Sequence, residues 1–172
     1  SDRRWGALTA RKTARTGFST ESSRSSTVTD HASYPEPQRV PLPDERQGVT
    51  YRFSIMSPEG EKKFYLTAGL YNGEEERLGE LFIKAGKEGS FISAALDLLM
   101  TTISIGLQHG IPLQDFTRKM RYVQCEPAGL VMSDVPVGLS GGSGQKFFAK
   151  SPFDYIAALL DHSYPDGCRR KL

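Results

Sequence analysis

The sequence predicts an α+β domain in which a small antiparallel sheet packs on one long helix and two shorter helices. Residues 50–84 contain three segments whose apolar side chains recur with the period of two that is typical of half-buried strands. Residues 90–107 repeat apolar side chains at helical spacing, and so do the shorter stretches 113–121 and 152–160.

The three strand segments are Thr50–Ile55, Lys63–Tyr71 and Leu78–Lys84. A turn after Ser57 separates the first two, and Asn72-Gly73 opens a turn between the second and the third. Because these connections are short, we expect a three-stranded antiparallel sheet.

The long helix is the element on which the rest of the domain is expected to pack. Ser90 is a good N-cap, and Gly110 suits the residue that follows the helix end. Asp97 lies in the middle of this helix, where we expect a buried and paired carboxylate. Two apolar stripes predict that the helix is covered from two directions: Ile92, Ala95, Leu96, Leu99, Ile103 and Leu107 form one, and Phe91, Ala94, Leu98 and Ile105 form the other.

The flanking segments define the predicted domain organisation. Pro112 fits the start of the second helix, and Ser151-Pro152 fits the start of the third. We expect a flexible, disordered basic arm at 1–39, a folded domain at 40–162 and a C-terminal tail at 163–172. Residues 136–150 form a Gly-rich loop by composition, which a natural insertion and an engineered joint would share.

Composition narrows the class of protein. The net charge of +2 is too small to imply a partner for the whole molecule, and two widely spaced cysteines do not form a disulfide scaffold or a CxxC site. We therefore expect a cytoplasmic protein. The longest apolar stretch is interrupted by Asp97 and several hydroxyl residues, so no membrane-spanning segment is expected.

The N-terminal arm carries the most uneven charge. It holds seven basic residues against four acids, so it could lie on a phosphate backbone or an acidic protein, serve only as a solvated linker, or be an organelle transit peptide. The candidate phosphate-binding or partner-binding residues are Arg3, Arg4, Arg11, Lys12 and Arg15.

The loop before the long helix is the candidate anion or nucleotide site. Backbone N–H groups at a helix start attract anions, and glycines allow a ligand to approach closely, although glycine also serves plain turn geometry. The candidate residues are Lys84, Gly86, Lys87, Gly89 and Ser90; their spacing is not that of a Walker A motif.

No catalytic or metal-binding constellation is predicted. His162 and Cys168 have a spacing unlike that of zinc pairs. His109 at a helix end suits the helix dipole better than it suits base catalysis. Cys125 is expected to be a packing residue, since its neighbour Glu126 would raise the thiol pKa.

Several segments together resemble the TSCPD-type domain, which occurs at the C-terminal end of adenosylcobalamin-dependent (class II) ribonucleotide reductases and as a stand-alone protein. The resemblance covers about Arg39 to Leu160 in order. The segments that carry it are L42-P-D-E-R-Q-G-V-T-Y-R-F-S-I55, F64-Y-L-T-A-G-L-Y71, L78-G-E-L-F-I-K-A-G-K-E-G-S90, I105-G-L-Q-H-G-I-P-L113, E126-P-A-G129 and S151-P-F-D-Y-I156.

The resemblance implies a link to deoxyribonucleotide synthesis. It does not imply catalysis by this chain, which lacks the cysteines and the length that a reductase needs, so cobalamin is expected only in the related full-length enzyme. The cysteine motif that names the domain is absent, and Cys168 stands alone near the C-terminus, so no metal or thiol site is carried over.

The sequence therefore predicts a non-catalytic accessory or regulatory module that docks on a protein partner or a nucleotide through Lys84–Ser90. One alternative is a nucleic-acid or ribonucleoprotein-associated subunit that uses the basic arm. The other is a small enzyme of nucleotide metabolism.

Overall fold

Over the residues that the structure describes, the protein is an α+β domain with a five-stranded antiparallel sheet and three α-helices. The computed structural model describes residues 38–73, 75–85, 90–135, 137 and 146–170. The elements are β1 (Gly48–Ser57), β2 (Gly60–Leu70), β3 (Leu78–Ala85), α1 (Phe91–Gln108), α2 (Leu113–Met120), β4 (Gly129–Ser133), β5 (Phe148–Ala149) and α3 (Pro152–Ser163).

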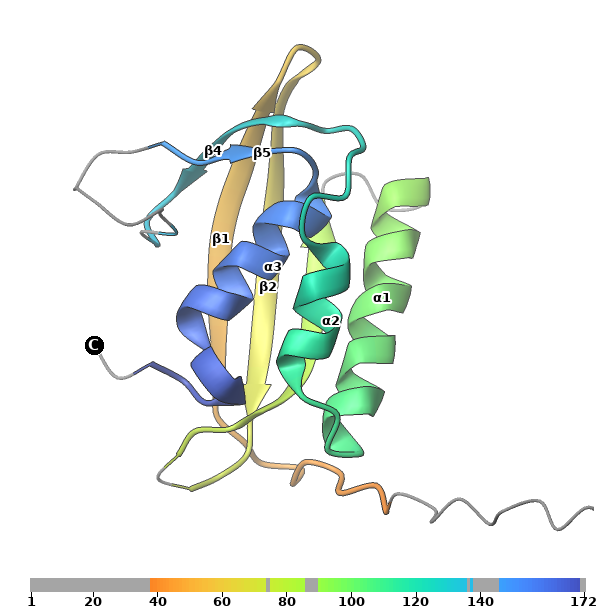
Figure 1. Ribbon diagram of the computed structural model, residues 1–172, viewed down its shortest axis with the longest axis vertical. Coiled ribbons are helices and arrows are strands. Elements are labelled where there is room, and N and C mark those ends of the chain that lie inside the picture. Colours follow the sequence, from red (N-terminus) through yellow and green to blue (C-terminus); the bar gives the residue numbers. More distant parts are fainter. Residues whose placement is uncertain (1–37, 74, 86–89, 136, 138–145, 171–172) are drawn as a thin grey trace, which may run out of the picture. The chain divides into compact units, whose positions relative to one another are not determined.

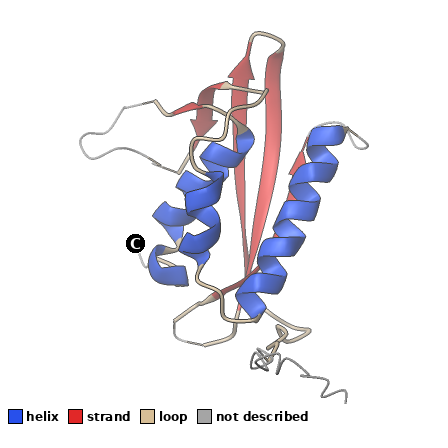
Figure 2. Cartoon of the chain, turned by 45° about the vertical axis from the view of Figure 1, so that its right-hand side comes forward, coloured by secondary structure: helices blue, strands red, loops and turns tan. Residues whose placement is uncertain are grey.

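The sheet has the strand order β3-β2-β1-β4-β5, and the helices lie on one face of it (Figures 1 and 2). The three predicted strands are confirmed as β1, β2 and β3. The prediction of a sheet of only three strands is wrong, because β4 pairs with β1 and β5 pairs with β4. These two strands contain five and two residues, too few to display an alternating pattern.

The core lies between the sheet and the helices. Phe53 and Phe64 from adjacent strands stack with ring centroids 5.0 Å apart, and Tyr155 of α3 lies 4.7 Å from Phe53. Burying each such side chain contributes roughly 1.5 to 3 kcal/mol, so this aromatic cluster fastens α3 to the sheet.

The predicted starts of α1 and α3 and the predicted end of α1 are confirmed. The Ser90 hydroxyl accepts a hydrogen bond from the Ser93 N–H at 3.3 Å, and the Ser151 hydroxyl accepts one from the Asp154 N–H at 3.1 Å. Gly110 has a φ of +81°, the left-handed conformation for which glycine ends helices. The third helix continues to Ser163, three residues beyond the predicted end at Leu160.

The prediction that α1 is covered from two directions is wrong for the described part of the chain. Leu96, Met100 and Ile103 are fully buried against β3 and the core. The second stripe is open to solvent, with exposed fractions of 87% for Phe91, 70% for Leu98 and 44% for Ile105. Asp97 is also exposed, which corrects the expectation of a buried carboxylate, since its position falls outside the stripe that faces β3.

By length and apolar content alone, α1 could also cross a membrane, with 39% of its residues buried in the protein. The core helix of a globular domain passes the same test. Two buried polar side chains of α1, Ser104 and Gln108, bond to the sheet, which is the behaviour of a helix packed on protein.

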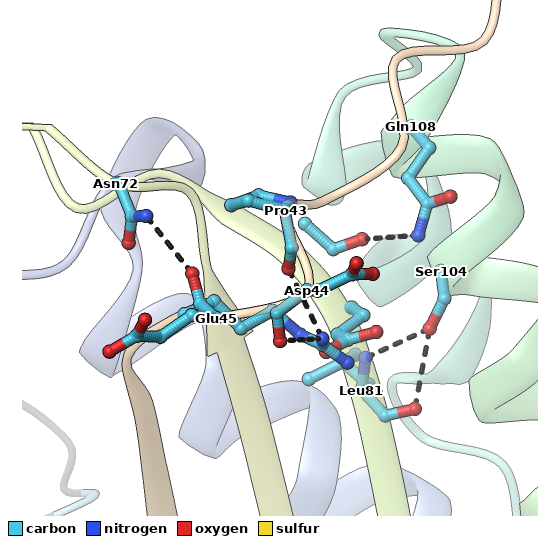
Figure 3. A network of polar contacts seen from close by, with 10 residues as sticks. Pro43, Asp44, Glu45, Asn72, Leu81, Ser104 and Gln108 are labelled. Atoms are coloured by element: carbon cyan, nitrogen blue, oxygen red, sulfur yellow. Dashed lines mark hydrogen bonds and ion pairs between the residues drawn. The ribbon is translucent and has the colours of Figure 1, made fainter.

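These two side chains protect the open edge of the sheet. Figure 3 shows Ser104 and Gln108, one helical turn apart, facing β3. The Ser104 hydroxyl accepts from the Leu81 N–H at 2.8 Å, and the Gln108 amide donates to the Gly79 carbonyl at 3.2 Å. Backbone groups that an edge strand would otherwise expose are therefore paired with α1.

Replacing Ser104 with alanine is expected to lower the free energy of unfolding by about 1 to 3 kcal/mol, because the buried Leu81 N–H loses its partner. Thr102→Ala is the matched control. The Ser104 hydroxyl also donates to the carbonyl of Met100, four residues earlier, and the Thr102 hydroxyl donates to the carbonyl of Leu98 in the same way, but the Thr102 side chain is exposed. Urea unfolding measures both variants. Equal effects would contradict the edge-protecting role of Ser104.

Candidate functional site

The predicted anion loop is described only at its two ends. Lys84 is an exposed residue near the end of β3, and Ser90 uses its hydroxyl to cap α1. Gly86, Lys87 and Gly89 lie outside the described residues, as do Arg3, Arg4, Arg11, Lys12 and Arg15 of the predicted arm. An anion site in either place stays a prediction.

The Gly-rich segment and the C-terminal segment are partly described. Residues 136 and 138–145 lie outside the described residues, whereas Phe148–Ala149 forms β5. In the C-terminal segment, the Arg170 N–H donates to the Ser163 carbonyl at 2.8 Å, and the guanidinium of Arg169 lies 3.0 Å from the Glu76 carboxylate. These contacts hold residues 163–170 against the body of the domain.

The first candidate surface is the exposed stripe of Phe91, Leu98 and Ile105, which we term the α1 face. These residues are spaced seven apart, so they follow one line along a helix of 18 residues, about 27 Å long. Three large apolar side chains that recur every two turns on a solvated helix form an apolar stripe, and exposed apolar surface of this kind marks interaction sites.

An apolar groove adjoins the α1 face. It has a volume of about 310 Å³ and lies between α1, α2 and the start of α3, where Leu99, Phe116, Met120, Val123 and Phe153 line it. Asp115 and Lys119 supply its charged rim. Leu99 follows Leu98 in α1, and consecutive residues project about 100° apart around a helix, so the groove opens on the side of α1 next to the α1 face.

A second cavity, of about 490 Å³, lies at the opposite end of α1 from Phe91, beside Val40, Tyr71, Arg77 and His109. The chain that leads into β1 is tied down here: the Val40 N–H donates to the Gln108 carbonyl at 2.9 Å, and the Tyr71 hydroxyl donates to the Val40 carbonyl. His109 contacts the Ile105 carbonyl through Nδ1 at 2.8 Å, so this ring nitrogen is engaged by the end of the helix.

Another buried polar element joins the start of α3 to the loop after α2. Asp154 is 3% exposed, and its carboxylate accepts from the Tyr122 N–H at 2.8 Å and the Lys150 N–H at 3.3 Å. The guanidinium of Arg121 lies 3.9 Å from the same carboxylate. These contacts tie the loop after α2 to the start of α3, so we assign the Asp154 carboxylate a structural role.

Cys125 lies beside this cluster. Burial raises the pKa of its thiol above the ordinary value, a hydrogen bond with Ser151 lowers it in part, and the nearby Glu126 carboxylate raises it again. A raised pKa disfavours the thiolate, which is the nucleophilic form of cysteine, and the packing role of Cys125 stays a prediction. Within the described ranges, no three His, Cys, Asp or Glu side chains gather to hold a metal ion.

A family model of the TSCPD domain matches residues 33–164. The chain belongs to the TSCPD domain family. This TSCPD chain is 38% identical over 133 residues to a vitamin B12-dependent ribonucleotide reductase of Rhodopirellula baltica, a match that covers 77% of the chain and 11% of that protein. A reductase of the same name from Streptomyces coelicolor is 32% identical over 137 residues, covering 80% of the chain and 13% of that protein.

A third relative, from Streptantibioticus cattleyicolor, is 33% identical over 120 residues, which cover 70% of the TSCPD chain and 19% of that reductase. The chain thus spans about a tenth to a fifth of the length of these curated relatives. No solved structure matches it.

The cofactor in the relatives' name does not fit the cavities described above. Cobalamin is a corrinoid macrocycle much larger than a drug-sized ligand, and volumes of about 490 and 310 Å³ lie in the lower half of the range for drug-sized pockets. We therefore derive no chemistry through cobalamin for this TSCPD chain.

The second apolar stripe of α1 is present as predicted, but its side chains are exposed among the described residues. Periodicity shows that a side chain needs a cover without showing what covers it.

Proposed function

We propose that the chain is a non-catalytic accessory module of vitamin B12-dependent ribonucleotide reduction, which docks on the reductase through the α1 face. The observation that carries the proposal is the exposure of Phe91, Leu98 and Ile105 in one line on a helix whose opposite side is buried. In this role the module serves deoxyribonucleotide synthesis by binding, while the reaction belongs to the larger protein.

Energetics support a docking role for the α1 face. Fully burying one such side chain contributes roughly 1.5 to 3 kcal/mol, so three of them can supply the apolar centre of an interface. Their spacing of seven residues is the repeat with which one helix packs along another. We therefore take the occupant to be an amphipathic helix that lies along α1 and inserts a side chain into the adjoining groove.

The comparisons support the identity of the partner. Each match covers between 11% and 19% of the relatives described above, so most of each reductase lies outside the part that resembles this chain. In such proteins the TSCPD part is joined to a much larger body. We therefore propose that this larger body supplies the surface that covers the α1 face.

The test is a calorimetric titration of the chain into a vitamin B12-dependent ribonucleotide reductase that lacks its own TSCPD part. The double variant Phe91→Gln/Leu98→Gln is expected to weaken binding at least tenfold, since two apolar anchors are lost. Glutamine is a good helix former and both positions are exposed, so the variant should remain folded.

The matched control is Phe82→Thr, which removes an exposed phenylalanine from β3 instead of α1. Its affinity for the reductase should equal that of the parent chain. Equal affinity of the α1 double variant, or no association of the parent chain, would refute docking through the α1 face. Turnover of ribonucleotides by the chain alone would refute the non-catalytic role.

A further inference from the structure

The face of the sheet that points away from the helices also carries exposed aromatic rings. Tyr65 of β2 is 42% exposed and Phe82 of β3 is 50% exposed. Their neighbours along each strand, such as Phe64 and Ile83, are buried against the helices, so Tyr65 and Phe82 project from the opposite face. Figure 2 shows no described helix on that side.

Strand register places these rings beside basic side chains. Tyr65 is paired with Arg52 of β1 on one side and with Lys84 of β3 on the other, so the three residues form one row across the sheet. Arg52 and Lys84 are exposed. Tyr65 therefore has a cation on each neighbouring strand.

Phe82 occupies the adjacent row, where it is paired with Thr67. Tyr65 and Phe82 are thus diagonal neighbours on adjacent strands, and such positions are about 7 to 8 Å apart. The Thr67 hydroxyl is hydrogen-bonded to that of Thr50 at 2.9 Å, so the side chains in the same row as Phe82 are small.

Two acids of these strands, Glu61 and Glu80, are engaged by their own partners. The Glu61 carboxylate lies 3.5 Å from the Lys63 amine, and Glu80 is paired with Arg46. Arg52 and Lys84 therefore give this face a positive local net charge, which favours an anionic ligand.

The two rings also differ from Tyr122, another exposed aromatic side chain of the domain. Tyr122 is 64% exposed, but Arg121 and Lys150 already lie 5.1 and 5.0 Å from its ring centroid. The cation–π contacts of the described residues involve Tyr71, Tyr122 and Phe147, so no described cation covers Tyr65 or Phe82.

We propose that this face of the sheet binds single-stranded nucleic acid, with bases stacked on Tyr65 and Phe82 and phosphates contacted by Arg52 and Lys84. Every base presents a π-face, and a polyanionic backbone matches the flanking cations. In a duplex the bases are stacked on one another and cannot reach the rings. The same chemistry is offered by DNA and RNA strands, which the experiment distinguishes.

The test is fluorescence anisotropy of the full chain with labelled oligo-dT and oligo-U of about 16 nucleotides, because single-strand sites commonly span 4 to 16 nucleotides. Tyr65→Leu/Phe82→Leu keeps apolar side chains but removes stacking, and it is expected to weaken binding at least fivefold. Arg52→Gln/Lys84→Gln should weaken binding and reduce the magnitude of the salt slope by about 1 to 1.5.

Controls separate this face from other parts of the protein. Phe91→Gln/Leu98→Gln should bind the oligonucleotides as the parent chain does, and duplex DNA should bind more weakly than either single strand. Unchanged affinity of Tyr65→Leu/Phe82→Leu would place binding elsewhere, for example in the basic arm, and would overturn the proposal. Absence of binding, or equal affinity for a mononucleotide, would overturn it as well.

Discussion

Asp154→Ala is expected to lower the free energy of unfolding by about 3 to 5 kcal/mol, the usual effect of removing one partner from a buried charged network. The carboxylate of Asp154 is the acceptor for the Tyr122 and Lys150 N–H groups and the neighbour of the Arg121 guanidinium. Without it, two backbone donors and a partly buried cation lose their partner. Chemical denaturation followed by circular dichroism measures the loss.

Asp161→Ala is the matched control, because Asp161 lies on the same helix but is exposed. It should change stability by less than about 0.5 kcal/mol. Asp154→Asn retains one acceptor oxygen and should fall between the two. A similar, small effect of Asp154→Ala and Asp161→Ala would show that the carboxylate does not hold the loop.

Gly129→Ala is the second substitution with a large expected effect. A Cβ atom at this position would lie 1.9 Å from the Met56 carbonyl oxygen and 2.8 Å from its carbon. Both atoms belong to the backbone of β1, which cannot move aside as a flexible side chain can. We expect a loss of about 3 kcal/mol, at the upper end of the range for overpacking, because β4 must separate from β1 at Met56–Leu130.

Gly48→Ala serves as the control, since the nearest atom to its added Cβ is the Ala68 carbonyl oxygen at 3.4 Å. Amide hydrogen exchange should locate the damage of Gly129→Ala in β4 and β5, with β2 and β3 still protected. Uniform loss of protection across all strands, or a stability equal to that of Gly48→Ala, would contradict this account.

The elements that sequence predicted are those with enough residues to display a period. β1, β2 and β3 have ten, eleven and eight residues, and α1 has eighteen. Local capping chemistry at Ser90 and Ser151 fixed the helix starts, since each cap depends only on residues close in sequence. β4 and β5 escaped prediction because they are short, β4 pairs with the distant strand β1, and β5 pairs with β4 across a Gly-rich segment.

The candidate sites were harder to predict for the same reason. Lys84 was predicted to serve a helix-start loop, yet strand register places it beside Tyr65 on the open face of the sheet. Asp97 was expected to be buried because its neighbours in sequence are apolar, but helix rotation turns it toward solvent. Which residues share a surface depends on register and rotation, and neither can be read from composition.

Docking through the α1 face is tested most directly by the affinity of the Phe91→Gln/Leu98→Gln variant for a vitamin B12-dependent ribonucleotide reductase without its own TSCPD part. Our account predicts a dissociation constant at least tenfold above that of the parent chain, with Phe82→Thr unchanged. An unchanged constant for the α1 variant, or an equal loss for Phe82→Thr, would contradict it.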